Sequence, residues 1–114
     1  MRYSERIRTL ALSFPETYED SPWGHPVFKV GNSKMFAWMS NDEDPLTVTM
    51  KVTPEEREMA LGLPYVRVAA YVGRYGWITA EVTDDESCEN ALEWLRESYW
   101  LKAPARLRDA ALES

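Results

Sequence analysis

The sequence predicts an α+β domain in which helices pack on one face of a mainly antiparallel sheet. Segments 46–52 and 77–82 alternate apolar and polar residues with the period of a half-buried strand. Segments 4–14 and 83–99 carry the apolar spacing of amphipathic helices. In chain order we expect a helix, three strands, a helix, one or two strands and two helices, which is typical of α+β folds.

The composition fits one folded domain over residues 1–114. Hydrophobic residues make up 45% of the chain and aromatic residues 12%, which is enough for a packed core. No apolar run approaches the roughly 20 residues that span a bilayer, and the N-terminal sequence lacks the features of a signal peptide. The single cysteine excludes an internal disulfide and a cysteine-rich metal site. We therefore expect a soluble, cytoplasmic protein without a metal or cofactor.

The first helix is predicted from Ser4, as its N-cap, toward Phe14. Four apolar residues form one stripe along it: Ile7, Leu10, Ala11 and Phe14. Pro15 ends the helix. Segment 15–26 contains three prolines and a glycine, so we interpret it as a structured loop.

A β-hairpin is predicted next. Segments 27–30 and 34–39 flank the turn Gly31-Asn32-Ser33, in which Gly and Asn tolerate positive φ. The pattern leaves open which side chains of these two strands point inward. A polar turn at 41–45 leads to a third strand, whose buried face comprises Leu46, Val48, Met50 and Val52.

A helix-capping sequence follows, with Thr53 as cap, Pro54 at the first helical position and Glu56 three residues after the cap. This helix is expected to end near 62–64. Segment 66–72 is compatible with a strand or with an extended loop. Segment 77–82 is a strand with Ile78, Ala80 and Val82 on one face.

The last long helix is predicted to begin at Thr83 as N-cap, paired with Glu86 in a capping box. Its apolar stripe comprises Cys88, Ala91 or Leu92, Leu95 and Tyr99. Pro104 interrupts the helix, and segment 105–112 is predicted to form a final short one.

Catalytic chemistry has two candidate residues. His25 is a possible general base, but it precedes Pro26, which favours an extended backbone at a strand entrance. Cys88 is a possible nucleophile, but acidic neighbours oppose its thiolate, and its position on the apolar stripe fits a small buried side chain. The sequence contains no glycine-rich phosphate-binding loop and no nucleophile elbow. An enzyme that uses His25 is therefore the third of our three functional hypotheses.

Nucleic-acid binding is the first hypothesis, and five basic residues are its candidate contacts: Lys29, Lys34, Lys51, Arg67 and Arg74. Further basic residues, Lys102, Arg106 and Arg108, lie near the C-terminus. With Trp38 and Trp77 they would form a surface that meets phosphates and stacks on bases. The net charge of −6 and the pI of about 4.8 oppose this function overall, although a local patch can act within an acidic protein. The structural alternative is a solvated sheet face on which lysines keep the strand edges soluble.

A groove for a protein or a small ligand is the second hypothesis. Its candidate lining is aromatic: Trp23, Phe28, Trp38, Tyr71 and Trp77. Segment 15–26 would form its rim. This hypothesis predicts a contiguous apolar cavity and no contribution from lysines.

Several motifs, in order, resemble those of the MmcQ/YjbR family of small bacterial proteins. They are the hairpin 27–37 with its "FKV" and "K-x-FA" sequences, the "KVTPE" sequence at 51–55, the "GW" strand start at 76–77 and the "SY" pair at 98–99. The opening "LALSFPETYED" is similar to the first helix and loop of that family, so the resemblance extends from about Ile7 to Leu107.

This resemblance implies a CyaY-like α+β fold and a DNA-binding role through a double-wing arrangement of strands. Lys29, Lys34 and Trp77 match recurrent family positions. The family supplies no catalytic residues and no cofactor. If the DNA-binding role holds here, the wings would be the tip at 31–34 and the region 67–74, and the affinity would fall steeply with salt.

Overall fold

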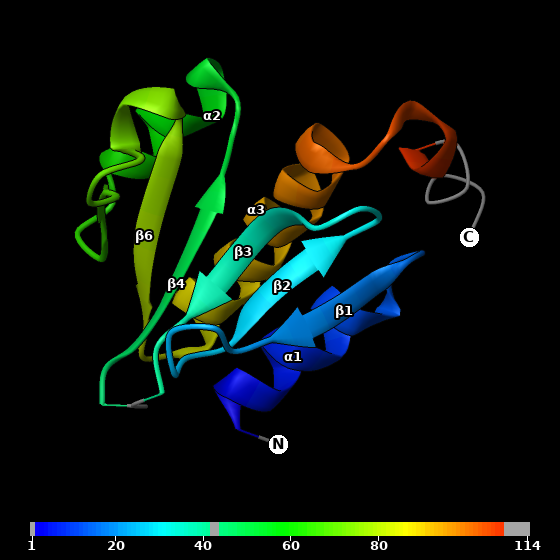
Figure 1. Ribbon diagram of the computed structural model, residues 1–114. Coiled ribbons are helices and arrows are strands. Elements are labelled where there is room, and N and C mark those ends of the chain that lie inside the picture. Colours follow the sequence, from blue (N-terminus) through cyan, green and yellow to red (C-terminus); the bar gives the residue numbers. More distant parts are fainter. Residues whose placement is uncertain (1, 42–43, 109–114) are drawn as a thin grey trace.

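The computed structural model describes residues 2–41 and 44–108, and within them six strands form one antiparallel sheet in the order β1-β2-β3-β4-β6-β5 (Figure 1). The strands are β1 (Thr17–Asp20), β2 (Val27–Val30), β3 (Lys34–Met39), β4 (Leu46–Lys51), β5 (Val66–Val68) and β6 (Trp77–Val82). The helices are α1 (Tyr3–Ser13), α2 (Pro54–Leu61) and α3 (Asp85–Lys102), with a short 3-10 helix η1 (Gly73–Tyr75). The predicted α+β class is confirmed.

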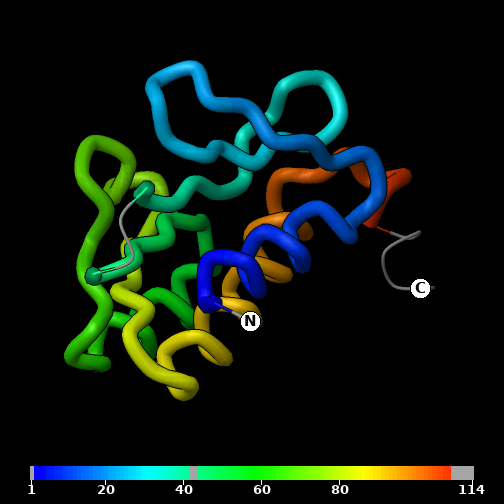
Figure 2. The backbone as a smooth tube through the Cα atoms, turned by 90° about the horizontal axis from the view of Figure 1, so that it is seen from below, coloured from blue at the N-terminus to red at the C-terminus, as the bar shows by residue number. Residues whose placement is uncertain are grey.

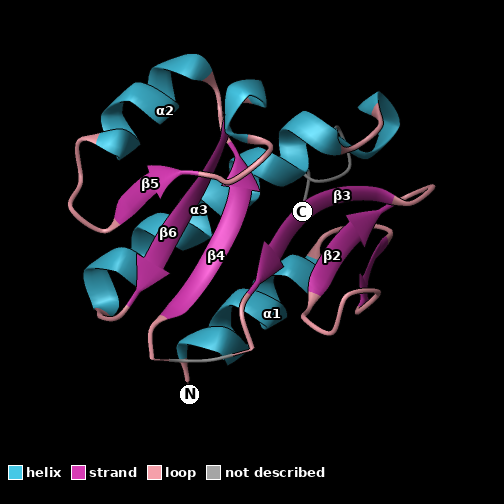
Figure 3. Cartoon of the chain, turned by 60° about the vertical axis from the view of Figure 1, so that its left-hand side comes forward, coloured by secondary structure: helices cyan, strands magenta, loops and turns pink. Residues whose placement is uncertain are grey.

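The helices cover one face of the sheet and leave the other to loops. α3 runs behind β3, β4 and β6, and α1 lies beside it (Figures 1 and 2). In Figure 3, where the sheet lies in front of α1 and α3, the connection that leaves β5 passes across the strands on the face opposite to these helices. We call this the open face.

The core lies between the sheet and the helices, and an aromatic cluster joins α1 to α3. The ring of Tyr99 stacks on Phe14 with centroids 4.6 Å apart and meets Phe36 edge-on at 5.6 Å. The Tyr99 hydroxyl donates a hydrogen bond of 2.9 Å to the carbonyl of Pro15, where the chain leaves α1. Tyr99 is 1% exposed, so this buried hydroxyl has the partner that it needs.

A β-bulge in the hairpin decides which of its side chains face the core. Phe28 pairs with Ala37 and Lys29 pairs with Met35, so Phe36 has no partner across the ladder. Phe36 and Ala37 are consecutive and both fully buried, and Phe36 contacts the helix-side rings. The bulge therefore turns two adjacent residues toward the helices and leaves Met35 and Trp38 on the open face.

Ser98 of α3 joins two strands beside this bulge. The ladder between β3 and β4 extends from the Ala37–Met50 pair to Met39–Val48 and does not include Phe36 or Lys51. The fully buried Ser98 hydroxyl donates to the Phe36 carbonyl and accepts a hydrogen bond of 2.9 Å from the Lys51 N–H. One side chain thus satisfies two backbone groups where the strands diverge, and it holds Lys51 at this end of the sheet.

The helix start at residue 53 was predicted correctly, but two other caps were not. Thr53 caps α2 by accepting from the Glu56 N–H at 3.3 Å. Ser4 lies inside the first turn of α1, where Arg2 is the N-cap, and Ser4 is buried. Asp84, not Thr83, caps α3, because its carboxylate accepts from the Ser87 N–H at 2.8 Å while the Ser87 hydroxyl accepts from the Asp84 N–H.

Segment 15–26 is not entirely a loop, because Thr17–Asp20 forms the edge strand β1. Segment 66–72, which was compatible with strand or loop, contains the short strand β5 followed by turns. Of the predicted final helix, residues 105–108 are helical, and residues 109–112 lie outside the described part of the chain.

Candidate functional site

An apolar groove lies on the open face, where two loops rise over the sheet. Its volume is about 460 Å³, which falls within the range of small-molecule sites. Three segments build it: the loop before β2, strand β3 and the turn after β5. Its lining comprises Trp23, His25, Met35, Trp38, Ala70, Tyr71 and Val72.

The floor of the groove is the ring of Trp38, which stacks on a second tryptophan, Trp77. The rings of Trp38 and Trp77 lie 5.2 Å apart with an interplanar angle of 27°. Trp77 is 5% exposed, while Trp38 is half-buried and lines the groove. Trp77 does not line the groove itself, but its stacking fixes the plane of the Trp38 ring.

The walls of the groove are aromatic side chains that face solvent. Trp23 is 69% exposed and Tyr71 is 98% exposed. Tyr71 also has a positive φ of 65°, which is rare for a large side chain and fixes its direction relative to the turn. The Trp23 ring stacks on the imidazole of His25 with centroids 6.1 Å apart.

The groove brings together three of the five aromatic residues predicted to line it, namely Trp23, Trp38 and Tyr71. Trp77 stacks on Trp38 and does not line the groove. The proposal that Phe28 lines the groove is wrong, because Phe28 is fully buried and pairs across the hairpin with Ala37 on the helix side.

His25 and Cys88 lie on opposite sides of the sheet. In the described part of the chain His25 makes its ring contact with Trp23, and no carboxylate there hydrogen-bonds its imidazole. Cys88 is fully buried on α3. Burial raises the pKa of the Cys88 thiol, which opposes thiolate formation at neutral pH.

Two of the five basic residues predicted to contact nucleic acid, Lys29 and Arg67, form ion pairs with carboxylates. Lys29 makes an ion pair of 2.9 Å with Asp20, and its side chain is only 19% exposed. The Asp20 carboxylate raises the pKa of Lys29 through this hydrogen bond. Arg67 lies 3.7 Å from the Glu81 carboxylate of the neighbouring strand. Lys34, Lys51 and Arg74 have no carboxylate partner within residues 2–41 and 44–108.

Lys34 and Lys51 lie near Lys102, which the sequence placed in a separate C-terminal group. Burial lowers the pKa of Lys102, and the positive charges of Lys51 and Lys34 lower it further. These three lysines come from β3, β4 and the end of α3. They create a local positive field at one end of an acidic protein.

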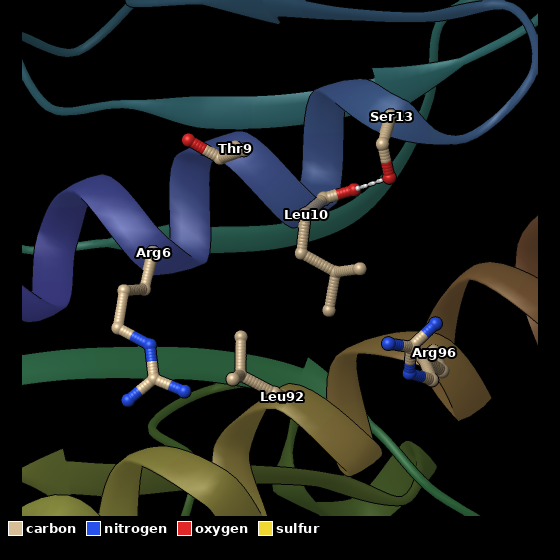
Figure 4. A pocket seen from close by; sticks show the side chains of 6 residues that line it. All are labelled: Arg6, Thr9, Leu10, Ser13, Leu92 and Arg96. Carbon is tan, nitrogen blue, oxygen red and sulfur yellow. Dashed lines mark hydrogen bonds between the residues drawn. The ribbon is translucent and has the colours of Figure 1, made fainter.

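A second hollow lies between α1 and α3 and is a shallow packing crease of about 290 Å³. Leu10 and Leu92 point toward each other across it, with Arg6 and Arg96 on either side (Figure 4). Both arginines have acidic neighbours, Glu89 for Arg6 and Glu93 for Arg96. The crease is therefore a place where α1 and α3 pack through two leucines, and the charges of the arginines beside it are neutralised by glutamates.

Metal and membrane chemistry find no structural support in the described residues. Over 2–41 and 44–108, no group of three or more His, Cys, Asp or Glu side chains is placed to hold a metal ion. In the same ranges, none of the helices combines the length and the apolar character needed to cross a bilayer.

The sheet and its helices form an α+β domain of the YjbR type. The YjbR family model matches residues 12–101, and the chain belongs to this family. No curated protein matches the sequence.

Two solved structures are similar to this chain. Protein DR2400 of Deinococcus radiodurans, described as a DUF419 domain, is 28% identical with a TM-score of 0.77, and the match covers 89% of this chain and 78% of that one. A protein from Pseudomonas syringae is 19% identical with a TM-score of 0.67, covering 90% and 99% of the two chains. The second likeness concerns the fold alone.

Sequence reasoning missed part of the groove lining. His25 was singled out as a catalytic candidate and was predicted at the groove only as part of the rim segment 15–26. Met35 was not considered, because the bulge that turns it to the open face leaves no pattern in the sequence. Ala70 and Val72 lie in a segment whose structure the sequence left open.

Proposed function

We propose that this domain is a non-catalytic binding module that holds a flat aromatic group of a small ligand in the open-face groove. The observation that supports this proposal is the groove itself, an apolar hollow of about 460 Å³ with the ring of Trp38 as its floor. Trp23 and Tyr71 stand beside this floor with most of their surface in water.

The exposed tryptophan and tyrosine side chains around the groove can bury apolar surface when a ligand binds, which favours binding. Each aromatic side chain has about 150–250 Å² of surface to bury, and contiguous exposed apolar patches mark interaction sites. A flat ligand that covers Trp23 and Trp38 would remove apolar surface from water on both partners.

The ligand chemistry follows from the walls. Aromatic rings prefer offset-stacked or edge-on contacts. Stacking on Trp77 already fixes the plane of the Trp38 ring, so this ring is ready to receive a ligand ring. The His25 imidazole at the rim offers a hydrogen bond to a polar edge of the ligand. A planar heteroaromatic group, apolar on its faces and polar at its edge, fits this arrangement.

Isothermal titration calorimetry, in which indole or adenosine is added to the protein and the dissociation constant is measured, tests the proposal. Trp23→Ala and Tyr71→Ala are suitable variants because both side chains are exposed, so neither should disturb folding. We expect each to weaken binding about three- to tenfold, since stacking on one ring contributes about 1 kcal/mol. Trp100→Ala is the matched control, because Trp100 is a partly exposed tryptophan on α3 outside the groove. Equal effects of Trp23→Ala and Trp100→Ala would contradict the proposal.

Nucleic-acid binding is the second candidate function, and the cluster of Lys34, Lys51 and Lys102 favours it. These lysines share one end of the sheet and have no carboxylate partner in the described residues. Single strands suit the site better than duplexes, because unstacked bases can lie on exposed rings.

Fluorescence anisotropy with single-stranded and duplex DNA, at low and physiological salt, tests this second candidate. Weak binding that salt abolishes, and that Lys34→Glu/Lys51→Glu removes, would support it. The single reversal Arg96→Glu, compared with Lys34→Glu alone, is the control for net charge. Binding that is equal in these two single variants, or absent at low salt, would exclude it.

A further inference from the structure

We infer that a further cavity, the cationic cavity lined by Lys51, Arg57 and Arg74, is a binding site for a phosphate group. This cavity is separate from the aromatic groove and holds a different kind of ligand group. The inference therefore stands whether or not the groove binds a ring.

The cavity has a volume of about 470 Å³ and lies at the end of the sheet where β4 leads into α2. Lys51 ends β4, Arg57 lies on α2 and Arg74 lies on η1, so three separate elements contribute one cation each. None of the described residues that line the cavity is acidic. Such convergence of like charge disfavours an empty site and favours one that contains an anion.

The charge distribution of the whole chain makes this cluster unusual. Among the described residues, seven of the thirteen Lys and Arg side chains form ion pairs with carboxylates: Arg2, Arg6, Arg8, Lys29, Arg67, Arg96 and Arg106. The three cations of the cavity make no ion pair within the same residues, although the chain has 19 acidic residues to 13 basic ones. The positive charge of this cavity is therefore not neutralised by carboxylates of the described residues, although the protein as a whole is acidic.

The side chains are held in place around the cavity. The guanidinium of Arg74 lies over the ring of Tyr75, 4.8 Å from its centroid, and donates a hydrogen bond of 2.8 Å to the Tyr75 hydroxyl. Gly76 has a φ of +94°, and a Cβ there would meet the carbonyl of Val52 at 3.2 Å. Glycine lets the chain pass close to β4, where the stem of Lys51 lies beside it.

Arg57 carries an unsatisfied donor. Its Nε is buried and has no hydrogen-bond partner in the described residues. A buried N–H without an acceptor is costly. A rotation of the guanidinium toward the cavity would give Nε and one Nη a shared oxyanion, in the forked geometry that arginine uses for phosphate.

The number of cations selects the class of anion. A phosphate monoester carries close to two negative charges at neutral pH and offers three acceptor oxygens. Three cations from three elements suit three oxygens, whereas a carboxylate brings one charge and two oxygens. The volume leaves room for the organic part of a small phosphorylated molecule.

Titration of the isotope-labelled protein with inorganic phosphate, phenyl phosphate and acetate at constant ionic strength tests the inference. The readouts are the backbone amides of Arg74 and Gly76 and the Nε–H signal of Arg57. We expect saturable shifts with both phosphates and none with acetate. Tighter binding of phenyl phosphate would identify the ligand as a phosphorylated molecule, and equal binding would identify it as the free anion; both support the site.

Arg57→Gln should weaken phosphate binding about tenfold or more, the effect of losing one charged hydrogen bond. Lys51→Gln replaces a side chain that is partly exposed, so it tests the site independently if Arg57→Gln folds poorly. Arg96→Gln is the control, because it removes one positive charge from α3 outside the cavity. Equal weakening by Arg57→Gln and Arg96→Gln, or binding of acetate as tight as that of phosphate, would overturn the inference.

Discussion

Replacing Ser98 by alanine removes one oxygen atom and two hydrogen bonds. The Ser98 hydroxyl donates to the Phe36 carbonyl and accepts from the Lys51 N–H, and the side chain is fully buried. Alanine fits the same space, so steric strain is not introduced. The change therefore isolates the cost of leaving two backbone groups without partners.

The expected magnitude follows from that geometry. A buried polar group that loses its partner costs about 1–3 kcal/mol. Because two groups lose partners at once, we expect Ser98→Ala to lower the free energy of unfolding by about 2–6 kcal/mol. This is a large share of the roughly 5–15 kcal/mol that stabilises a typical domain.

Urea unfolding followed by circular dichroism measures this difference. Ser13→Ala is the matched control, since the Ser13 hydroxyl also donates to a backbone carbonyl, that of Leu10, but in an exposed position. We expect the control to change the stability by less than about 0.5 kcal/mol. A Ser98→Ala variant as stable as the control would refute the role assigned to Ser98 at the diverging strands.

Three further predictions concern other parts of the fold. Gly73→Ala places a Cβ 2.2 Å from Val68 Cγ1 and should destabilise the domain by about 1–3 kcal/mol; thermal unfolding unchanged from the parent would contradict this. Cys88 should resist alkylation at pH 8 in the native protein and react on unfolding, because burial raises its pKa; fast native modification, detected by mass spectrometry, would count against its burial. Hydrogen bonds from Ser87 lower the pKa of Asp84, so its stabilising effect is present above the unfolded pKa of about 3.9 and is lost as the pH falls through the folded value. Asp84→Ala should therefore be less stable than the parent at neutral pH, with a difference that narrows in acid; a gap independent of pH in denaturant unfolding would refute this.

Local patterns in the sequence were sufficient for most of the fold. The alternation of 46–52 and 77–82 predicted β4 and β6, and Thr53-Pro54 predicted the start of α2. These patterns involve only neighbouring residues, and the tertiary structure agrees with the secondary structure that they predict. The edge strand β1 was missed because its residues are mostly exposed and polar, so it carries no apolar alternation.

Features that depend on distant residues were not predictable. The β-bulge opposite Phe28 decides that Phe28 and Phe36 face the helices while Met35 and Trp38 face the groove. Strand pairing brings Asp20 to Lys29 and Glu81 to Arg67, which neutralises two residues that the sequence offered for nucleic acid.

The two candidate sites also differ in how far the sequence could predict them. The number of aromatic residues around the hairpin and its neighbouring segments suggested a groove, and three of those named, Trp23, Trp38 and Tyr71, line the one that the structure contains. The cationic cavity left no comparable signal. Lys51, Arg57 and Arg74 come from β4, α2 and η1, and only the packing of these elements places them around one hollow.

If the open-face groove holds a flat ring, the indole N–H signals of the tryptophans around it report the binding most directly. In a two-dimensional NMR titration with indole, we expect the signals of Trp23 and Trp38 to shift and saturate together. Trp94 is an internal control, because its indole N–H donates to Glu56 between the helices on the other side of the sheet. Shifts confined to Trp23, Trp38 and Trp77, which stacks on Trp38, would show that the ring binds in the groove. No shifts, or shifts of equal size at Trp94, would contradict it.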